Sequence, residues 1–143
     1  MKFDWSSYLK LAETLFDEVT NSSRQANSSS MDEAKIRSSI SRAYYSAFCL
    51  ARNYLRDIEG DGKLKTDKVG IHEYVIKELE SSRNNADRRY LGQCLSRLRG
   101  LRNEVDYEDY IASNLLTSKA KQTLKNANKV IELLNKLTSS QKP

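Results

Sequence analysis

Proline is almost absent from this chain of 143 residues, because the only one is Pro143, the last residue. A proline inside a helix removes a backbone hydrogen bond and clashes with the preceding turn. Glycine, the other residue that weakens helices, occurs five times. A chain with so few interruptions can form helices over most of its length, so the sequence predicts an all-α protein.

Five segments carry apolar residues at spacings of three and four, which is the pattern of a helix with one buried face. The predicted helices are Asp4–Thr20, Met31–Ile58, Ile71–Ser81, Asp87–Val105 and Ser113–Leu137. The stretches 21–30 and 60–70 are polar or rich in glycine, and we expect loops there. Helices with short connections favour an antiparallel up-and-down bundle of about five helices. We expect one domain over residues 1–143, with residues 138–143 as a disordered tail.

The composition is that of a folded, water-soluble domain, with 38% hydrophobic and 30% charged residues. No stretch approaches the roughly 18 to 20 apolar residues that cross a bilayer, and the first residues lack the apolar core of a signal peptide. We therefore expect a cytoplasmic protein without membrane contact. The net charge of +5 suits an acidic partner such as nucleic acid, although many domains without such a partner carry a similar charge.

The two cysteines, Cys49 and Cys94, stand far apart and in no metal-binding or redox spacing. We expect both to be small buried apolar residues. No phosphate-binding loop, nucleophile motif or metal-ligand cluster is visible, so the sequence predicts no cofactor and no metal.

Arg102 interrupts an apolar stripe, because helical spacing places it between Leu98 and Val105. Arginine is rarely buried without a partner. One alternative is an ion pair with Asp106, which lies one helical turn further on. The other is a ligand phosphate or a second subunit.

The second alternative is a binding site on the same side of this helix. Arg99, Arg102 and Asn103 lie there together, and arginine binds phosphate oxygens in bidentate fashion. The helix 31–58 has a second unusual face, formed by Ser38, Ser41, Arg42, Tyr45, Cys49 and Arg52. We expect this face to pack against another helix or to form a dimer seam.

Three parts of the sequence resemble the HEPN domain family, above all its small stand-alone prokaryotic members. They are RSSISRAYYSAFCLARNYL at residues 37–55, the lone His72, and LSRLRGLRNEVDY at residues 95–107. The signatures R-A-Y-Y-x-A-F and L-R-x-x-x-D-Y are both present, and the opening at residues 4–9 fits as well. The resemblance covers almost the whole chain and implies a helical bundle that usually forms a homodimer.

The resemblance also implies a range of activities. Many HEPN proteins are metal-independent ribonucleases that act as toxins or defence effectors, and others bind RNA or nucleotides without cleaving them. The nucleases carry R-x4-H, often beginning R-N. Arg102 and Asn103 match this beginning, but the histidine position is Tyr107. Cys49 also stands where the stand-alone members tend to have histidine.

Cleavage of RNA without a metal needs a base for the 2′-hydroxyl and a cation for the phosphorane. Arg102 is the candidate cation. The candidates for the base are Asp106, Tyr107 and His72, and each has a weakness. Asp106 can be occupied by Arg102, and a phenol is a weak base near neutral pH. His72 has a suitable side chain, with an ordinary pKa of about 6.5, but the sequence does not place it beside Arg102. Whether the protein is an enzyme therefore stays open.

Three hypotheses follow. The leading one is a binder of RNA or a nucleotide in a dimer cleft, through Arg42, Tyr45, Arg99, Arg102 and Asn103, within a toxin–antitoxin or antiviral module. The second is a metal-independent ribonuclease with an altered catalytic motif. The third is a non-catalytic partner of a nucleotidyltransferase-like protein, which in related toxin systems can modify a tyrosine beside the motif. Tyr107 or Tyr110 would be that tyrosine here.

Overall fold

The computed structural model describes residues 2–21, 30–66 and 69–141. Within these ranges the chain is helical and contains no strand, which confirms the all-α prediction. The helices are α1 (Ser6–Thr20), α2 (Ser30–Asn53), α3 (Lys63–Thr66), α4 (Ile71–Glu80), α5 (Ala86–Tyr107) and α6 (Ser113–Gln141). The end of α2 continues into one turn of π-helix, η1 (Tyr54–Ile58).

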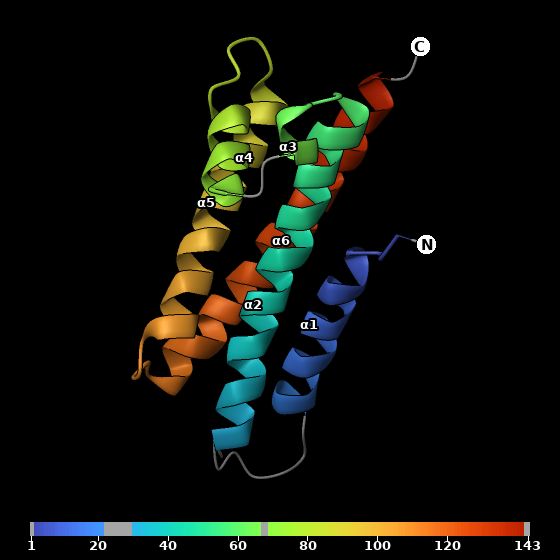
Figure 1. Cartoon of the computed structure of the whole chain (residues 1–143). Coiled ribbons are helices and arrows are strands. Elements are labelled where there is room, and N and C mark those ends of the chain that lie inside the picture. The colour runs from blue at the N-terminus through green and yellow to red at the C-terminus, as the bar shows by residue number, and fades with distance from the viewer. Residues whose placement is uncertain (1, 22–29, 67–68, 142–143) are drawn as a thin grey trace.

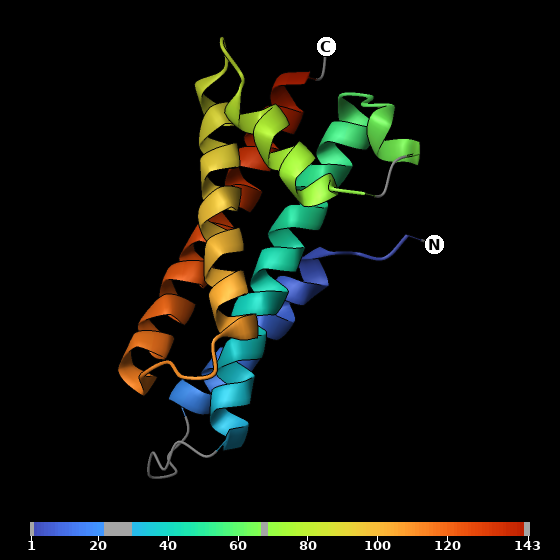
Figure 2. The ribbon, with the colours of Figure 1, turned by 60° about the vertical axis from the view of Figure 1, so that its left-hand side comes forward.

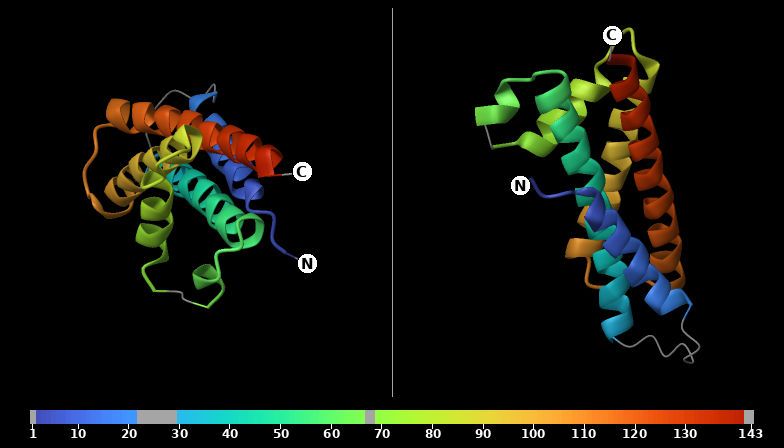
Figure 3. Two further views of the ribbon diagram at one scale, coloured as in Figure 1. Left: turned by 90° about the horizontal axis from the view of Figure 1, so that it is seen from above. Right: turned by 90° about the vertical axis from the view of Figure 1, so that its right-hand side faces the viewer.

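The four long helices run up and down, each antiparallel to the next one along the chain (Figure 1). α2 is the central element, because it packs against α1, α5 and α6. The short helices α3 and α4 connect the end of α2 to the start of α5, and they project to one side of the bundle (Figures 2 and 3). The start of α4 thereby lies against the upper half of α2.

Small residues on α2 bring α1 close to it. Ser39 and Ser46 are fully buried, and their hydroxyl groups donate to backbone carbonyls of the α1 segment. Ser39 Oγ donates to Ala12 O at 2.6 Å, and Ser46 Oγ donates to Trp5 O at 2.8 Å. The face of α2 that contacts α1 thus includes Ser39 and Ser46, which are not part of the unusual face noted in the sequence. That face is not covered by a helix, because Ser38 is exposed and Arg42, Tyr45 and Arg52 are only half-buried. Cys49 and Cys94 are buried and free, as predicted.

A short helix forms inside the stretch that we expected to be a loop. Asp61 begins α3, because its side chain accepts from Lys63 N at 3.1 Å and its carbonyl accepts from Leu64 N at 3.3 Å. Leu64 is buried and anchors this turn to the core. The expected loop was therefore wrong for residues 63–66, while residues 67–68 lie outside the described residues.

The last helix is longer than predicted. α6 runs to Gln141 and not to Leu137, so residues 138–141 are helical and not a disordered tail. Leu133, Leu134 and Leu137 are buried and hold these last turns against the bundle. Residues 142–143 lie outside the described residues, as do residues 22–29, which form most of the predicted serine-rich loop.

The end of α5 is held by Arg37 on α2. Its Nη1 donates to Val105 O and to Glu108 O, both at 2.7 Å, and its Nε donates to Glu33 at 3.0 Å. The last carbonyls of a helix lack partners within the helix, and a guanidinium supplies donors for them. Arg37 thus fixes the helical turn that carries Arg102 and Asp106.

Candidate functional site

A groove of about 380 Å³ opens where the start of α1, the middle of α2 and the start of α4 meet. Phe48 and Cys49 are almost completely buried and form its apolar floor. Its half-buried walls are formed by Trp5, Tyr8, Arg42, Tyr45, Arg52 and His72. The groove therefore brings together three of the predicted site residues, namely Arg42, Tyr45 and His72.

Aromatic rings and guanidinium groups alternate along the groove and onto α5. Arg52 lies over the ring of Trp5, with its Cζ 5.5 Å from the ring centroid. Arg42 lies between Tyr8 and Tyr45, at 5.0 Å and 5.5 Å from their centroids. These distances are those of cation–π contacts. The rings and cations thus hold one another in fixed positions along the wall.

Arg102 continues this row from α5. Its Cζ lies 5.0 Å from the centroid of the Tyr45 ring, and its Nη2 donates to the Tyr45 hydroxyl. Its Nη1 donates to Asn103 Oδ1 at 3.0 Å. Its Nε lies 2.8 Å from Asp106 Oδ2, although this ion pair is not a well-directed hydrogen bond. The predicted pair of Arg102 with Asp106 is confirmed, so the charge of Arg102 is largely compensated within the fold.

Two arginines of the groove wall, Arg42 and Arg52, have no such compensation, and neither has Arg99 on α5, which acts electrostatically on His72. Among the described residues, no carboxylate lies within ion-pairing distance of Arg42, Arg52 or Arg99. Arg52 donates instead to the side-chain amide of Asn53, at 3.1 and 2.9 Å. Positive charge without a counter-ion is costly to hold together on a half-buried surface. This site is therefore suited to an anion.

His72 lies at the start of α4 and turns its ring into the groove. The ring stacks on Phe48 with centroids 4.0 Å apart, and Nδ1 shares a hydrogen bond of 2.6 Å with the Tyr44 hydroxyl. Burial, followed by Arg99, Arg102 and Arg52, lowers the pKa of His72 to about 4. The imidazole is thus neutral near pH 7, and the arginines oppose its taking up a proton.

Tyr107 lies apart from this arrangement. Its side chain is 73% exposed and makes no hydrogen bond or ring contact with a described residue. Tyr110, three residues past the end of α5, is 85% exposed. The structure therefore joins Arg102 to Tyr45, Asn103 and Asp106, but it does not join Tyr107 to this group.

The comparison with protein families agrees with these features. A family model described as the HEPN domain matches residues 9–137, which is nearly the whole chain. The chain belongs to the HEPN family. Neither the curated proteins nor the solved structures contain a significant match. Trp5 and Tyr8 precede the matched residues, whereas Arg42, Tyr45, His72 and Arg102 lie within them.

Sequence reasoning missed three residues of this HEPN groove. Arg52 shares one side of α2 with Arg42 and Tyr45, and this spacing was a usable signal. The spacing of Trp5 and Tyr8 fits the apolar stripe of the predicted helix Asp4–Thr20, which indicates two core residues and not two residues of a groove. That they face a groove depends on where α4 packs, which local spacing does not specify.

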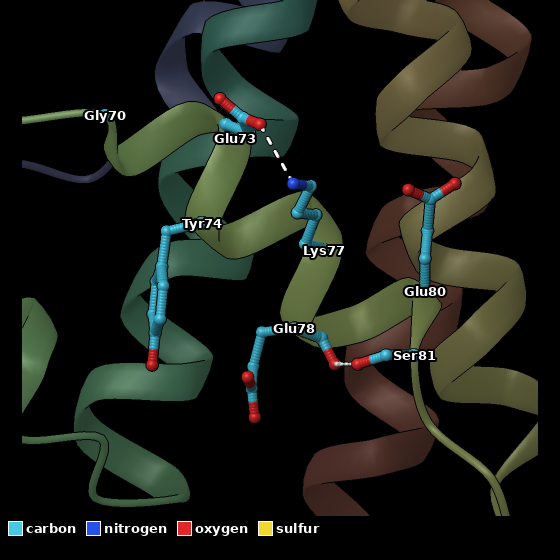
Figure 4. A pocket seen from close by; sticks show the side chains of 7 residues that line it. All are labelled: Gly70, Glu73, Tyr74, Lys77, Glu78, Glu80 and Ser81. Atoms are coloured by element: carbon cyan, nitrogen blue, oxygen red, sulfur yellow. Dashed lines mark hydrogen bonds and ion pairs between the residues drawn. The ribbon is translucent and has the colours of Figure 1, made fainter.

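A larger hollow, of about 650 Å³, lies along α4, and Figure 4 shows the side chains around it. Glu73, Glu78 and Glu80 contribute carboxylates, and Lys77 pairs with Glu73 at 3.1 Å. None of the predicted site residues lines it. Its mixed but mainly acidic lining is a poor match for phosphate.

The described residues contain no group of three or more histidine, cysteine or acidic side chains that could hold a metal ion. No helix among them is both long and apolar enough to span a bilayer.

Proposed function

We propose that this HEPN protein binds RNA or a nucleotide in the groove between α1, α2 and α4. The observation that carries the proposal is that Arg42 and Arg52 line an aromatic-walled groove without a carboxylate partner among the described residues. Arg99 adds a third such charge, close enough to His72 in the groove to lower its pKa. The volume of about 380 Å³ falls in the range of small-ligand sites, about 300–1,000 Å³.

The proposal assigns each residue a role. Arg42 and Arg99 bind phosphate oxygens, since guanidinium groups bind them in bidentate fashion. Tyr45 offers its ring, and Arg102 holds that ring in place through its hydrogen bond to the hydroxyl. Asn103 fixes Arg102 from the exposed side of α5.

Binding is favoured over cleavage because none of the three candidate bases is placed and charged so that it could accept a proton from the 2′-hydroxyl of RNA. Asp106 is held by Arg102, and Tyr107 has no contact with the group. His72 is neutral, but a proton on its ring would be repelled by Arg99, Arg102 and Arg52. A general base must accept a proton near the operating pH, and the arginines work against this.

The biological setting of the proposal is a homodimer within a toxin–antitoxin or antiviral module, which membership of the HEPN family supports. Light scattering is expected to give a mass of twice 16.4 kDa. A mass of 16.4 kDa at every concentration would contradict the dimer.

A second candidate function is partnership with a nucleotidyltransferase-like protein. The high exposure of Tyr107 and Tyr110 supports it, because a modifying enzyme needs access to the hydroxyl. A stable complex with such a protein, without affinity for RNA, would favour this alternative.

The test uses labelled single-stranded and structured RNAs in excess EDTA, with wild type, Arg42→Ala, Arg102→Ala and Tyr107→Phe. Lys125→Ala, an exposed residue on α6, is the control for a lost positive charge. We expect binding without cleavage, weakened in Arg42→Ala and Arg102→Ala but not in Lys125→Ala. Cleavage that disappears in Arg102→Ala would make the protein a ribonuclease instead, and the absence of any binding would refute the proposal.

A further inference from the structure

The first residues of the chain form an aromatic cluster beside the groove. The rings of Phe3, Trp5 and Tyr8 meet edge to face, with centroid distances from 4.8 to 5.6 Å. The hydroxyl of Ser46 holds the cluster against α2, because it donates to the carbonyl of Trp5 at 2.8 Å. Trp5 and Tyr8 line the groove, and Phe3 stands 52% exposed outside it.

This cluster does more than fill a core. A tryptophan and a tyrosine that only pack α1 onto α2 would be buried, yet both remain half-buried. A third half-buried ring of the lining, that of Tyr45, shares the guanidinium of Arg42 with Tyr8. Arg52 lies over the ring of Trp5 and Arg42 over the ring of Tyr8, so each ring has a phosphate-binding cation on one face.

Flat aromatic surfaces next to cations are the surfaces on which unpaired bases stack. The bases of a duplex are already stacked on one another and paired, so they do not offer their faces to such rings. A groove lined in this way therefore distinguishes single strands from duplexes by access to the base.

We propose that Trp5, Tyr8 and Tyr45 form a stacking subsite for an unpaired nucleobase, and that Arg42 and Arg52 turn from the ring faces they cover to hold the adjoining phosphates. The protein then binds single-stranded RNA in preference to duplex RNA of the same sequence. The inference rests on the proposed function. It adds that the ligand is single-stranded, and it adds Trp5 and Tyr8, which precede the family match at residues 9–137.

Trp5 is the sole tryptophan of the chain, so its fluorescence reports on this subsite alone. The experiment titrates the protein with a short single-stranded oligoribonucleotide, the corresponding duplex, and inorganic polyphosphate, which carries no base. We expect the single strand to quench Trp5 and to bind about tenfold more tightly than the duplex. Polyphosphate should bind without comparable quenching.

Variants of Tyr8 test the stacking itself, and labelled RNA gives their affinity by fluorescence anisotropy. Tyr8→Leu should weaken single-strand binding about tenfold and leave polyphosphate binding unchanged, whereas Tyr8→Phe should restore the affinity. Tyr90→Leu, on the exposed side of α5, is the control for a lost aromatic ring. Far-UV circular dichroism confirms that each variant is folded.

The outcomes separate the two proposals. RNA binding that depends on Arg42 but leaves Trp5 unquenched, or equal affinity for single strand and duplex, would overturn the subsite and leave the proposed function standing. Full affinity in Tyr8→Leu would also overturn it. No binding of any RNA would overturn both.

Discussion

At the scale of single residues, Asp106 competes with any ligand for Arg102. Its carboxylate lies 2.8 Å from Nε, and a phosphate has to share or replace this contact. We predict that Asp106→Asn tightens RNA binding by up to about fivefold. A factor of this size corresponds to the free energy of a partly exposed ion pair. Glu132→Gln on α6 removes the same charge far from this contact and is the control. Weaker binding in Asp106→Asn than in Glu132→Gln, measured by anisotropy, would contradict the prediction.

A second prediction at this scale concerns how stability depends on pH, and its direction follows from the lowered pKa of His72. The folded protein keeps the imidazole neutral down to about pH 4, whereas the unfolded chain takes up a proton near 6.5. Between these values the unfolded state binds more protons, so the free energy of unfolding should fall as the pH falls from 6.5 towards 4. His72→Gln should remove this contribution to the pH dependence.

The titration of His72 can be followed directly by NMR, because it is the only histidine. We expect a pKa of about 4 in the free protein and a higher value once RNA phosphate offsets the charge of the arginines. A pKa near 6.5 in the free protein would show that the ring is neither buried nor close to positive charge.

At the scale of helices, two glycines of α5 provide a matched pair. A Cβ at Gly92 would lie 2.7 Å from the backbone nitrogen of Glu80, where α4 ends against α5. A Cβ at Gly100 would meet nothing within 4 Å. We predict that Gly92→Ala destabilises the fold by about 1–3 kcal/mol through overpacking, and that Gly100→Ala stabilises it by about 0.5–1 kcal/mol.

Urea unfolding measures both changes. If both substitutions changed the free energy of unfolding in the same direction, this would contradict the close approach of α4 to α5. Helix propensity alone would then explain both changes. Both variants keep the groove residues, so they also show whether packing at this end of α4 affects RNA binding through His72.

Local spacing predicted most of the helices but not how they end. The ranges of α2, α4 and α5 begin within one residue of the predicted positions, because apolar periodicity is a property of neighbouring residues. The same spacing indicated the pair of Arg102 with Asp106 as one of two alternatives, and the structure contains it. The π-helical turn at Tyr54–Ile58, the short α3 and the extension of α6 were missed, because they depend on buried contacts with distant segments.

At the scale of the whole molecule, the groove is a product of topology. Trp5 directly precedes α1, Arg42 lies on α2 and His72 on α4, and the three meet only because α1 and α4 pack against α2. No spacing along the chain predicts this meeting. The sequence therefore indicates Arg42, Tyr45, Arg99 and Arg102 as candidates, but not Arg52, the rings of Trp5 and Tyr8, or the neutral state of His72.

The central claim is that unpaired arginines of this groove bind RNA phosphate, and its most direct test is the salt dependence of RNA affinity. Each phosphate contact of a single strand contributes about −0.7 to the slope of log K against log salt. Three unpaired arginines predict a slope of about −2, and Arg42→Ala should reduce it by about 0.7, whereas Lys125→Ala should leave it unchanged. An affinity that does not depend on salt, or an unchanged slope in Arg42→Ala, would contradict the account.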